Sequence, residues 1–243
     1  MKWLFRRTAD RPADAIPQAS IEVAAPLHPK LMTNASILAT EYGQLATFES
    51  HRPTDANGEP VPWFTYGAIE YLNRFDCRNW HIFEYGCGHS TLYWRRRGAK
   101  VTSMEHNRKW FDEMSALELS DVTLLHGEDA NSYVSAIKRC DRQFDVIVID
   151  GVWRDLCAQV CLPYLKEDGI VILDNSDWYW DTADRIRRDG FFEFSFSGFG
   201  PVNDYTWTTS FFVPGPSARQ REFGRPDPIG GHPVGPEARD ELW

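Results

Sequence analysis

The sequence contains no long hydrophobic run. Its first apolar stretch, Trp3-Leu4-Phe5, has three residues, whereas the apolar region of a secretory signal has about 7–15. No window approaches the roughly 20 apolar residues that cross a membrane as a helix. We therefore expect a soluble, cytoplasmic protein that is not exported and has no membrane partner.

Cysteine is scarce and irregularly spaced. The chain has five cysteines, and none of them form a Cys-x-x-Cys pair. Cys157 and Cys161 stand four residues apart without a second pair of ligands. Zinc centres and disulfide frameworks repeat such pairs, so we expect reduced thiols, as is usual in the cytosol.

Positive charge is in the minority. The 26 Lys and Arg residues are outnumbered by 35 Asp and Glu residues, which leaves a net charge of −9. An acidic surface repels a phosphate backbone, so we do not expect a nucleic-acid partner. The run Arg95-Arg96-Arg97 is interpreted as a solvated helix end, where cations complement the helix dipole.

Strand and helix patterns alternate from residue 80 onward. Short apolar runs predict strands at 80–85, 100–104, 122–125, 144–149 and 169–173. Amphipathic segments predict helices at 90–97, 108–119, 131–139, 154–165 and 182–188, with Pro163 ending or kinking the fourth. Two further strands, 192–197 and 206–213, follow without a helix between them. This order predicts an α/β fold, in which a seven-stranded, mostly parallel sheet has helices on both faces and a C-terminal antiparallel β-hairpin.

The segments on either side divide the chain into three parts. Residues 1–76 are expected to form a loose arm and two helices, at 31–48 and 65–75. Residues 77–213 form the ligand-binding domain, and the Pro- and Gly-rich residues 214–243 form a mobile tail. Trp63, Phe64 and Tyr66 fit two interpretations equally, a lid over the ligand or packing of the N-terminal helices on the sheet.

Acidic residues and glycines follow the predicted strands. Ligands of open α/β sheets bind beyond the carboxyl ends of the strands. The segments at these ends are Glu84-Tyr85-Gly86-Cys87-Gly88, Glu105, Gly127-Glu128-Asp129, Asp150-Gly151 and Asp174-Asn175. The two glycines after the first strand allow a tight turn and a close backbone approach. Glu105 follows Glu84 by 21 residues, at the place where an acid binds ribose hydroxyls in nucleotide-binding folds.

The same residues distinguish between two kinds of nucleotide. A dinucleotide-binding loop needs a third glycine at position 91, where this chain has Thr91. Glu84 would also place a carboxylate where a pyrophosphate lies, and adjacent anions repel. Both residues favour an amino acid–nucleoside with a cationic amino group over a dinucleotide.

The segment Glu84-Tyr85-Gly86-Cys87-Gly88-His89-Ser90 resembles the first motif of class I S-adenosylmethionine-dependent methyltransferases. The resemblance extends from about Thr65 to Val213 and implies that S-adenosylmethionine is the cofactor. Glu84 would hold the methionine amino group and Glu105 the ribose hydroxyls. The implied cofactor-binding residues are Glu84, Tyr85, Gly86, Gly88, Ser90, Glu105, His106, Glu128, Asp129 and Asp150, with Glu128 or Asp129 near the adenine and Asp150 facing the substrate.

A metal site is implied by a second resemblance. Metal-dependent catechol-type O-methyltransferases bind a divalent cation with an acid after strand four and an Asp-Asn pair after strand five. Asp150, Asp174 and Asn175 occupy these positions and would suit Mg²⁺. The lysine that the family places three residues after the first acid is Trp153 here, and the neighbouring Arg154 is a poor base. Asp174-Asn175 also fits a simple strand-end turn, so both interpretations stay open.

These patterns predict an enzyme that moves a methyl group from S-adenosylmethionine to a small-molecule acceptor, on oxygen. Methyl transfer is an in-line displacement that depends mainly on alignment and exclusion of water, so few catalytic groups are needed. Asp150 and His89 are the catalytic candidates, and His89 equally fits a loop hydrogen-bonding role. The alternatives are a non-catalytic regulatory protein that binds the cofactor, and an NAD-dependent oxidoreductase. The sequence leaves the oligomeric state open.

Overall fold

The computed structural model describes residues 28–215, 224–228, 230–232, 234–236 and 238–239. The arm predicted at the start of the chain lies almost entirely outside these residues. The chain divides into two compact units, Met1–Ala35 and Ser36–Trp243. In the first unit the described residues belong mainly to helix α1 (Pro29–Ser36), and every element of the candidate site belongs to the second.

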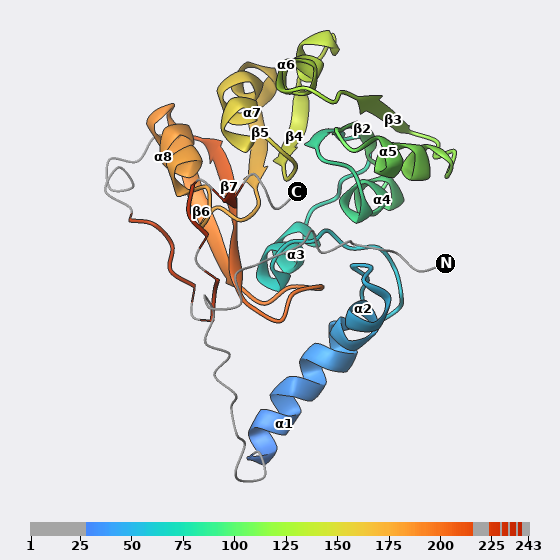
Figure 1. The fold of residues 1–243 in the computed structure, drawn as a ribbon, viewed down its shortest axis with the longest axis vertical. Coiled ribbons are helices and arrows are strands. Elements are labelled where there is room, and N and C mark those ends of the chain that lie inside the picture. Colours follow the sequence, from blue (N-terminus) through green and yellow to red (C-terminus); the bar gives the residue numbers. More distant parts are fainter. Residues whose placement is uncertain (1–27, 216–223, 229, 233, 237, 240–243) are drawn as a thin grey trace. The chain divides into compact units, whose positions relative to one another are not determined.

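Seven strands form one sheet in the order β3-β2-β1-β4-β5-β7-β6 (Figure 1). The strands are β1 (His81–Tyr85), β2 (Lys100–Glu105), β3 (Val122–His126), β4 (Phe144–Ile149), β5 (Leu165–Leu173), β6 (Phe191–Gly198) and β7 (Trp207–Pro214). The first five pair in parallel, whereas β7 is antiparallel to both β5 and β6. The predicted sheet, with its closing hairpin, is confirmed.

Helices cover both faces of this sheet (Figure 1). The helices of the second unit are α2 (Gln44–Ser50), α3 (Tyr66–Leu72), α4 (His89–Arg96), α5 (Arg108–Ser115), α6 (Ala130–Val134), α7 (Arg154–Cys161) and α8 (Trp180–Arg188). One apolar core contains buried side chains of α6, α7 and α8, and the other contains those of α3 and α4. Within the described residues, no helix is long and apolar enough to cross a membrane.

Alternation along the strands decides which side chains reach which core. In β1, Phe83 and Tyr85 pack on the face covered by α6–α8, and Ile82 packs on the face covered by α3 and α4. Successive strand residues point to opposite faces, so Glu84 lies on the same face as Ile82, under α4. This polar residue is therefore placed inside the molecule by the period of the strand.

Two predicted helices differ from the structure. The helix predicted at 31–48 is divided into α1, a π-helical turn (Ile37–Glu41) and α2. The break lies at Gly43, whose φ is 75° and where a Cβ would meet the carbonyl of Asp55 at 2.6 Å. The helix predicted at 154–165 ends at Cys161, because Pro163 lies in the 3₁₀ turn Leu162–Tyr164 that follows.

The C-terminal segment, predicted to be a mobile tail, makes specific contacts in its described residues. Gly231 pairs with Thr206 beside the last strand, and the His232 ring packs edge-on against Tyr205 at 4.4 Å between centroids. Arg239 is 3% exposed and forms ion pairs with Asp155 and Asp181. Charged and aromatic partners, which composition does not reveal, hold these residues on the domain.

Candidate active site

Glu84 lies at the end of β1 in a small polar cluster. The carboxylate oxygen Oε2 accepts hydrogen bonds from Thr91 Oγ1 at 2.6 Å and Ser103 Oγ at 2.7 Å. Thr91 belongs to the first turns of α4, and its hydroxyl also accepts the backbone N–H of Gly88 at 3.1 Å. This chain of bonds connects β1, β2 and the loop between β1 and α4.

The second oxygen of Glu84, Oε1, is buried and accepts no hydrogen bond from the part of the chain that the structure describes. Glu84 is 0% exposed. Burial raises its pKa from 4.5 to about 7, although the hydroxyls of Thr91, Ser103 and Ser90 act in the opposite direction. A buried acceptor without a donor is unfavourable, so this oxygen is suited to a ligand that brings a charged donor.

The loop after β1 passes very close to the end of β4. Gly86 has φ 102°, a conformation that favours glycine, and a Cβ there would meet the carbonyl oxygen of Asp150 at 3.1 Å and Gly151 Cα at 3.2 Å. The backbone N–H of Asp150 donates to Tyr85 O at 3.0 Å. Any side chain at position 86 would push these two strand ends apart.

Tyr85 and Ser90 lie on either side of the loop after β1. The Tyr85 ring is fully buried in the core, and its hydroxyl donates to Val134 O at 3.0 Å. Alternation along β1 turns it away from Glu84, so its side chain is not at the loop surface. Ser90 is 9% exposed in the first turn of α4.

Glu105 connects the loops after β1 and β2. Its Oε1 accepts the backbone N–H groups of His106 at 2.9 Å and Asn107 at 2.7 Å, and its Oε2 accepts that of Cys87 at 3.3 Å. Burial raises the pKa of Glu105, but the His106 side chain, whose Nδ1 lies 3.1 Å from Oε1, and the backbone donors of Asn107 and Cys87 outweigh burial and leave the pKa below its ordinary value. The carboxylate is therefore ionised and fixed in orientation.

Aromatic rings surround the loops that follow β1 and β2. His106 packs edge-on against Tyr133 and Trp153, with ring centroids 6.2 Å and 6.3 Å away. Tyr133 is fully buried, and its hydroxyl has no hydrogen-bond partner among the described residues. Trp110 of α5 donates its indole N–H to Cys87 O at 2.7 Å. The partly exposed rings of His106, Trp110 and Trp153 would provide flat surfaces for a purine.

Glu128 and Asp129 lie further out. Both are exposed, and Asp129 caps α6 by accepting the backbone N–H of Ser132 at 2.9 Å. Glu128 is 3.8 Å from His126 Nε2. The structure thus gives Asp129 a capping role, while Glu128 remains accessible near the end of β3.

The three residues predicted to bind a metal are brought together, but around an arginine. Arg154 of α7 is 0% exposed. Its guanidinium donates from Nη1 to Asn175 Oδ1 at 3.0 Å, and its Nη2 lies 3.2 Å from Asp150 Oδ1. Asp174 contributes its backbone carbonyl, which accepts a bond from Nη1 at 2.6 Å. A Mg²⁺ site would need oxygens of these three residues to be available to the ion. Here each of the three residues has an oxygen in contact with Arg154 instead.

The two catalytic candidates differ in their ionisation. Burial raises the pKa of Asp150, while the charge of Arg154 opposes the shift. Its side chain is 20% exposed, so this acid is partly accessible. Burial lowers the pKa of His89, at the start of α4, to about 4, with the charge of Arg52 acting in the same direction. His89 is therefore neutral at pH 7.

The partners of the predicted residues were missed by reasoning from the sequence. Thr91, Ser103, Tyr133 and Arg154 complete the cluster, yet each carries an ordinary side chain inside a predicted element. Thr91 was noted only as the position that lacks a third glycine. Its hydroxyl donates to Glu84, seven residues earlier, a contact that only the structure shows.

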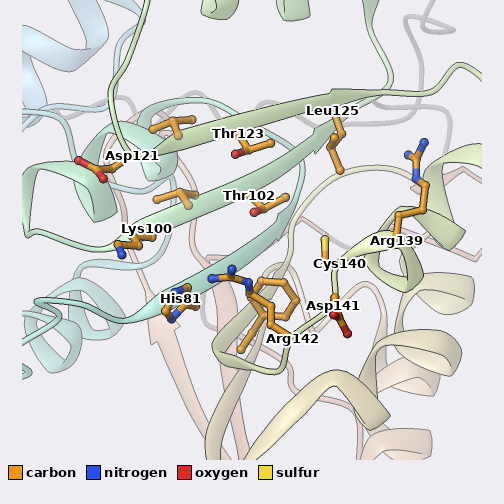
Figure 2. A pocket seen from close by; sticks show the side chains of 13 residues that line it. His81, Lys100, Thr102, Asp121, Thr123, Leu125, Arg139, Cys140, Asp141 and Arg142 are labelled. Carbon is orange, nitrogen blue, oxygen red and sulfur yellow. The ribbon is translucent and has the colours of Figure 1, made fainter.

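A separate hollow of about 500 Å³ lies over the start of β1 and the outer strands β2 and β3 (Figure 2). Lys100, Arg139 and Arg142 are among its lining residues, and Figure 2 shows them around an open sheet face. None of the predicted cofactor, catalytic or metal residues lines it. It is distinct from the cluster around Glu84.

Comparison with known proteins identifies the architecture. No family model matches the sequence, and no curated protein matches it. A solved structure assigned as a caffeoyl-CoA O-methyltransferase from Staphylococcus aureus is similar with a TM-score of 0.52 and 18% identity, over 76% of this chain and 98% of that chain.

Two further structures are similar at lower scores. A 1,6-didemethyltoxoflavin-N1-methyltransferase from Burkholderia thailandensis, solved with S-adenosylhomocysteine, has a TM-score of 0.44 and 14% identity, over 78% of this chain and 92% of that chain. An rRNA-methylase structure from Clostridium thermocellum has a TM-score of 0.48 and 12% identity, over 65% and 99%. With the strand order and the closing hairpin, the similarity to the Staphylococcus aureus structure shows that the chain has the class I methyltransferase fold.

Proposed function

We propose that this protein is an S-adenosylmethionine-dependent methyltransferase that acts on an oxygen of a small-molecule acceptor. The observation that carries the proposal is the buried Oε1 of Glu84, which has no hydrogen-bond partner among the described residues. A dinucleotide would bring a pyrophosphate to this acid, whereas the amino group of S-adenosylmethionine would bring a cation.

The remaining residues of the cluster fit the rest of the cofactor. Each carboxylate oxygen can accept two hydrogen bonds, so Glu105 retains acceptor capacity for ribose hydroxyls while its loop donors hold it in place. His106 and Trp153, which are both partly exposed, offer aromatic surfaces for the adenine. Gly86 keeps the loop free of a side chain where the ligand would approach.

When bound, S-adenosylmethionine supplies an activated methyl group for in-line displacement. The residues of this chain must then position the acceptor and take up its proton. Asp150 is suited to this role because it is partly exposed and its raised pKa makes it a stronger base than an ordinary aspartate. Neutral His89 could accept the proton in its place.

Oxygen as the acceptor atom is supported by the Staphylococcus aureus structure, which is assigned as an O-methyltransferase. The net charge of −9 disfavours a polynucleotide acceptor. A small-molecule acceptor is also consistent with the small number of catalytic groups that this reaction needs.

Calorimetry with S-adenosylhomocysteine and, separately, NADH tests the proposal. Wild type should bind S-adenosylhomocysteine and not NADH, and Glu105→Ala should lose that binding. Glu49→Ala, which changes an exposed glutamate on α2, should bind like wild type. Binding of NADH alone would favour an oxidoreductase, and a folded protein that binds neither ligand would contradict the proposal.

A further inference from the structure

We propose that the Arg154 guanidinium takes the place of a divalent cation in this site, so that the protein needs no metal. The inference rests on the proposed function, because it concerns how the acceptor is held for methyl transfer. Its evidence is the geometry of the loops after β4 and β5, which is independent of any ligand.

The guanidinium lies among the oxygens that a cation would need. Asn175 Oδ1 and Asp150 Oδ1 lie 3.0 Å and 3.2 Å from its terminal nitrogens. Nε also donates to Gly151 O at 2.9 Å. Mg²⁺ binds oxygen ligands at about 2.0–2.1 Å, so an ion shared by Asp150 and Asn175 would have to lie within a few ångströms of the guanidinium.

One oxygen of the Asp174 carboxylate is bonded to another part of the sheet. This oxygen, Oδ1, accepts hydrogen bonds from the indole N–H of Trp207, at 3.1 Å, and from the Thr209 hydroxyl. Both donors belong to β7, so this carboxylate supports the hairpin. One carboxylate oxygen of Asp174 is therefore held by β7, and the backbone carbonyl of Asp174 is bonded to Arg154.

Repulsion between two cations completes the argument. Arg154 stays protonated at all accessible pH values. It is fully buried, and its guanidinium carbon lies 4.7 Å from the centroid of the Tyr179 ring. Two like charges so close together repel strongly in a poorly solvated site, so Arg154 excludes a second cation.

This arrangement restricts the acceptor. A metal can bind two neighbouring hydroxyls of a catechol-type acceptor in open coordination positions, which a buried guanidinium does not offer. We therefore expect an acceptor that presents a single nucleophilic oxygen to Asp150. Arg154 acts as a positioning residue, since it contacts Asp150 and is itself shielded from the ligand.

Manganese titration followed by electron paramagnetic resonance tests the inference without turnover. Metal-free wild type, with and without S-adenosylhomocysteine, should cause no loss of the free Mn²⁺ signal. Arg154→Ala should gain one bound Mn²⁺, and the double variant with Asn175→Ala should lose it. Arg187→Ala, which removes another buried arginine paired with Glu193, should not gain a site that depends on Asn175.

Either of two results of the manganese titration would overturn the inference. Stoichiometric Mn²⁺ binding by wild type, abolished by Asn175→Ala, would show that Arg154 and a metal coexist. A folded Arg154→Ala variant that gains no Mn²⁺ site would show that Arg154 does not stand in for a cation. If this variant does not fold, the wild-type titration alone decides. If wild type does not bind S-adenosylhomocysteine, the proposed function is contradicted, and the manganese result is unaffected.

Discussion

Glu84 and Ser103 face each other in register on the parallel strands β1 and β2, and the Ser103 hydroxyl donates to Glu84 Oε2 at 2.7 Å. The bond occupies one oxygen of a fully buried acid and leaves the other, Oε1, without a described donor. This pair therefore holds a carboxylate that is costly to the empty protein and available to a cationic ligand.

Replacing Glu84 with glutamine should separate stability from binding. The pKa of Glu84 rises from 4.5 in the unfolded chain to about 7 in the folded protein. The folded state therefore holds the proton more tightly, and the stability of wild type falls as pH rises from 4.5 to 7. Above pH 7, Glu84→Gln should be more stable than wild type by up to about 3 kcal/mol.

Urea denaturation at pH 4, 6 and 8 checks this expectation. The difference between Glu84→Gln and wild type should increase with pH, and S-adenosylhomocysteine binding should be lost in the variant. A difference in unfolding free energy that does not change with pH would contradict the assignment. Ser103→Ala should keep the pH dependence and weaken binding less, since Thr91 still donates to the carboxylate.

Gly86→Ala should destabilise the protein and abolish cofactor binding. A side chain at φ 102° costs about 1–3 kcal/mol, and this Cβ would also press on Asp150 O at 3.1 Å. Gly190 is a matched control, because its φ is 97° and nothing lies within 4 Å of a Cβ built there. Gly190→Ala should lose stability from backbone strain alone. Equal loss of S-adenosylhomocysteine binding in both variants would argue against a close approach at Gly86.

Asp150 should control the acid limb of the pH–rate profile. Burial raises its pKa above the ordinary 3.8, whereas burial lowers the pKa of His89 to about 4. Once an acceptor is identified, activity should fall with decreasing pH well above pH 4. Asp150→Asn should remove this limb and lower kcat by about 10²–10⁴, and His89→Asn should keep it. A limb that survives in Asp150→Asn would assign the proton transfer to another group.

Arg239 should hold the C-terminal segment on the domain. It is 3% exposed and bonds to Asp155 and Asp181, whose side chains are 38% and 43% exposed. Because these partners are partly solvated, Arg239→Ala should cost about 1–2 kcal/mol, between the values for exposed and buried pairs. Hydrogen exchange should increase in the described residues between 224 and 239. Arg139→Ala, at an exposed position, should leave that exchange unchanged.

The fold was predictable because its signals are local. The alternation of apolar strands and amphipathic helices determined the sheet, and the break in the helix predicted at 31–48 was missed because Gly43 approaches Asp55 through a turn. The glycines and acids at strand ends were also found, since parallel strands bring their carboxyl ends to one edge.

The sequence by itself determined that Glu84, Gly86, Glu105 and Asp150 would meet at one edge of a parallel sheet, because position along a strand decides where each residue emerges. Only the tertiary structure decided which cation lies among Asp150, Asp174 and Asn175. Arg154 reaches them from α7, from 20 and 21 residues before the latter two, and contacts of this kind depend on side-chain packing between elements. The same reason applies to Arg239, whose partners are 58 and 84 residues away.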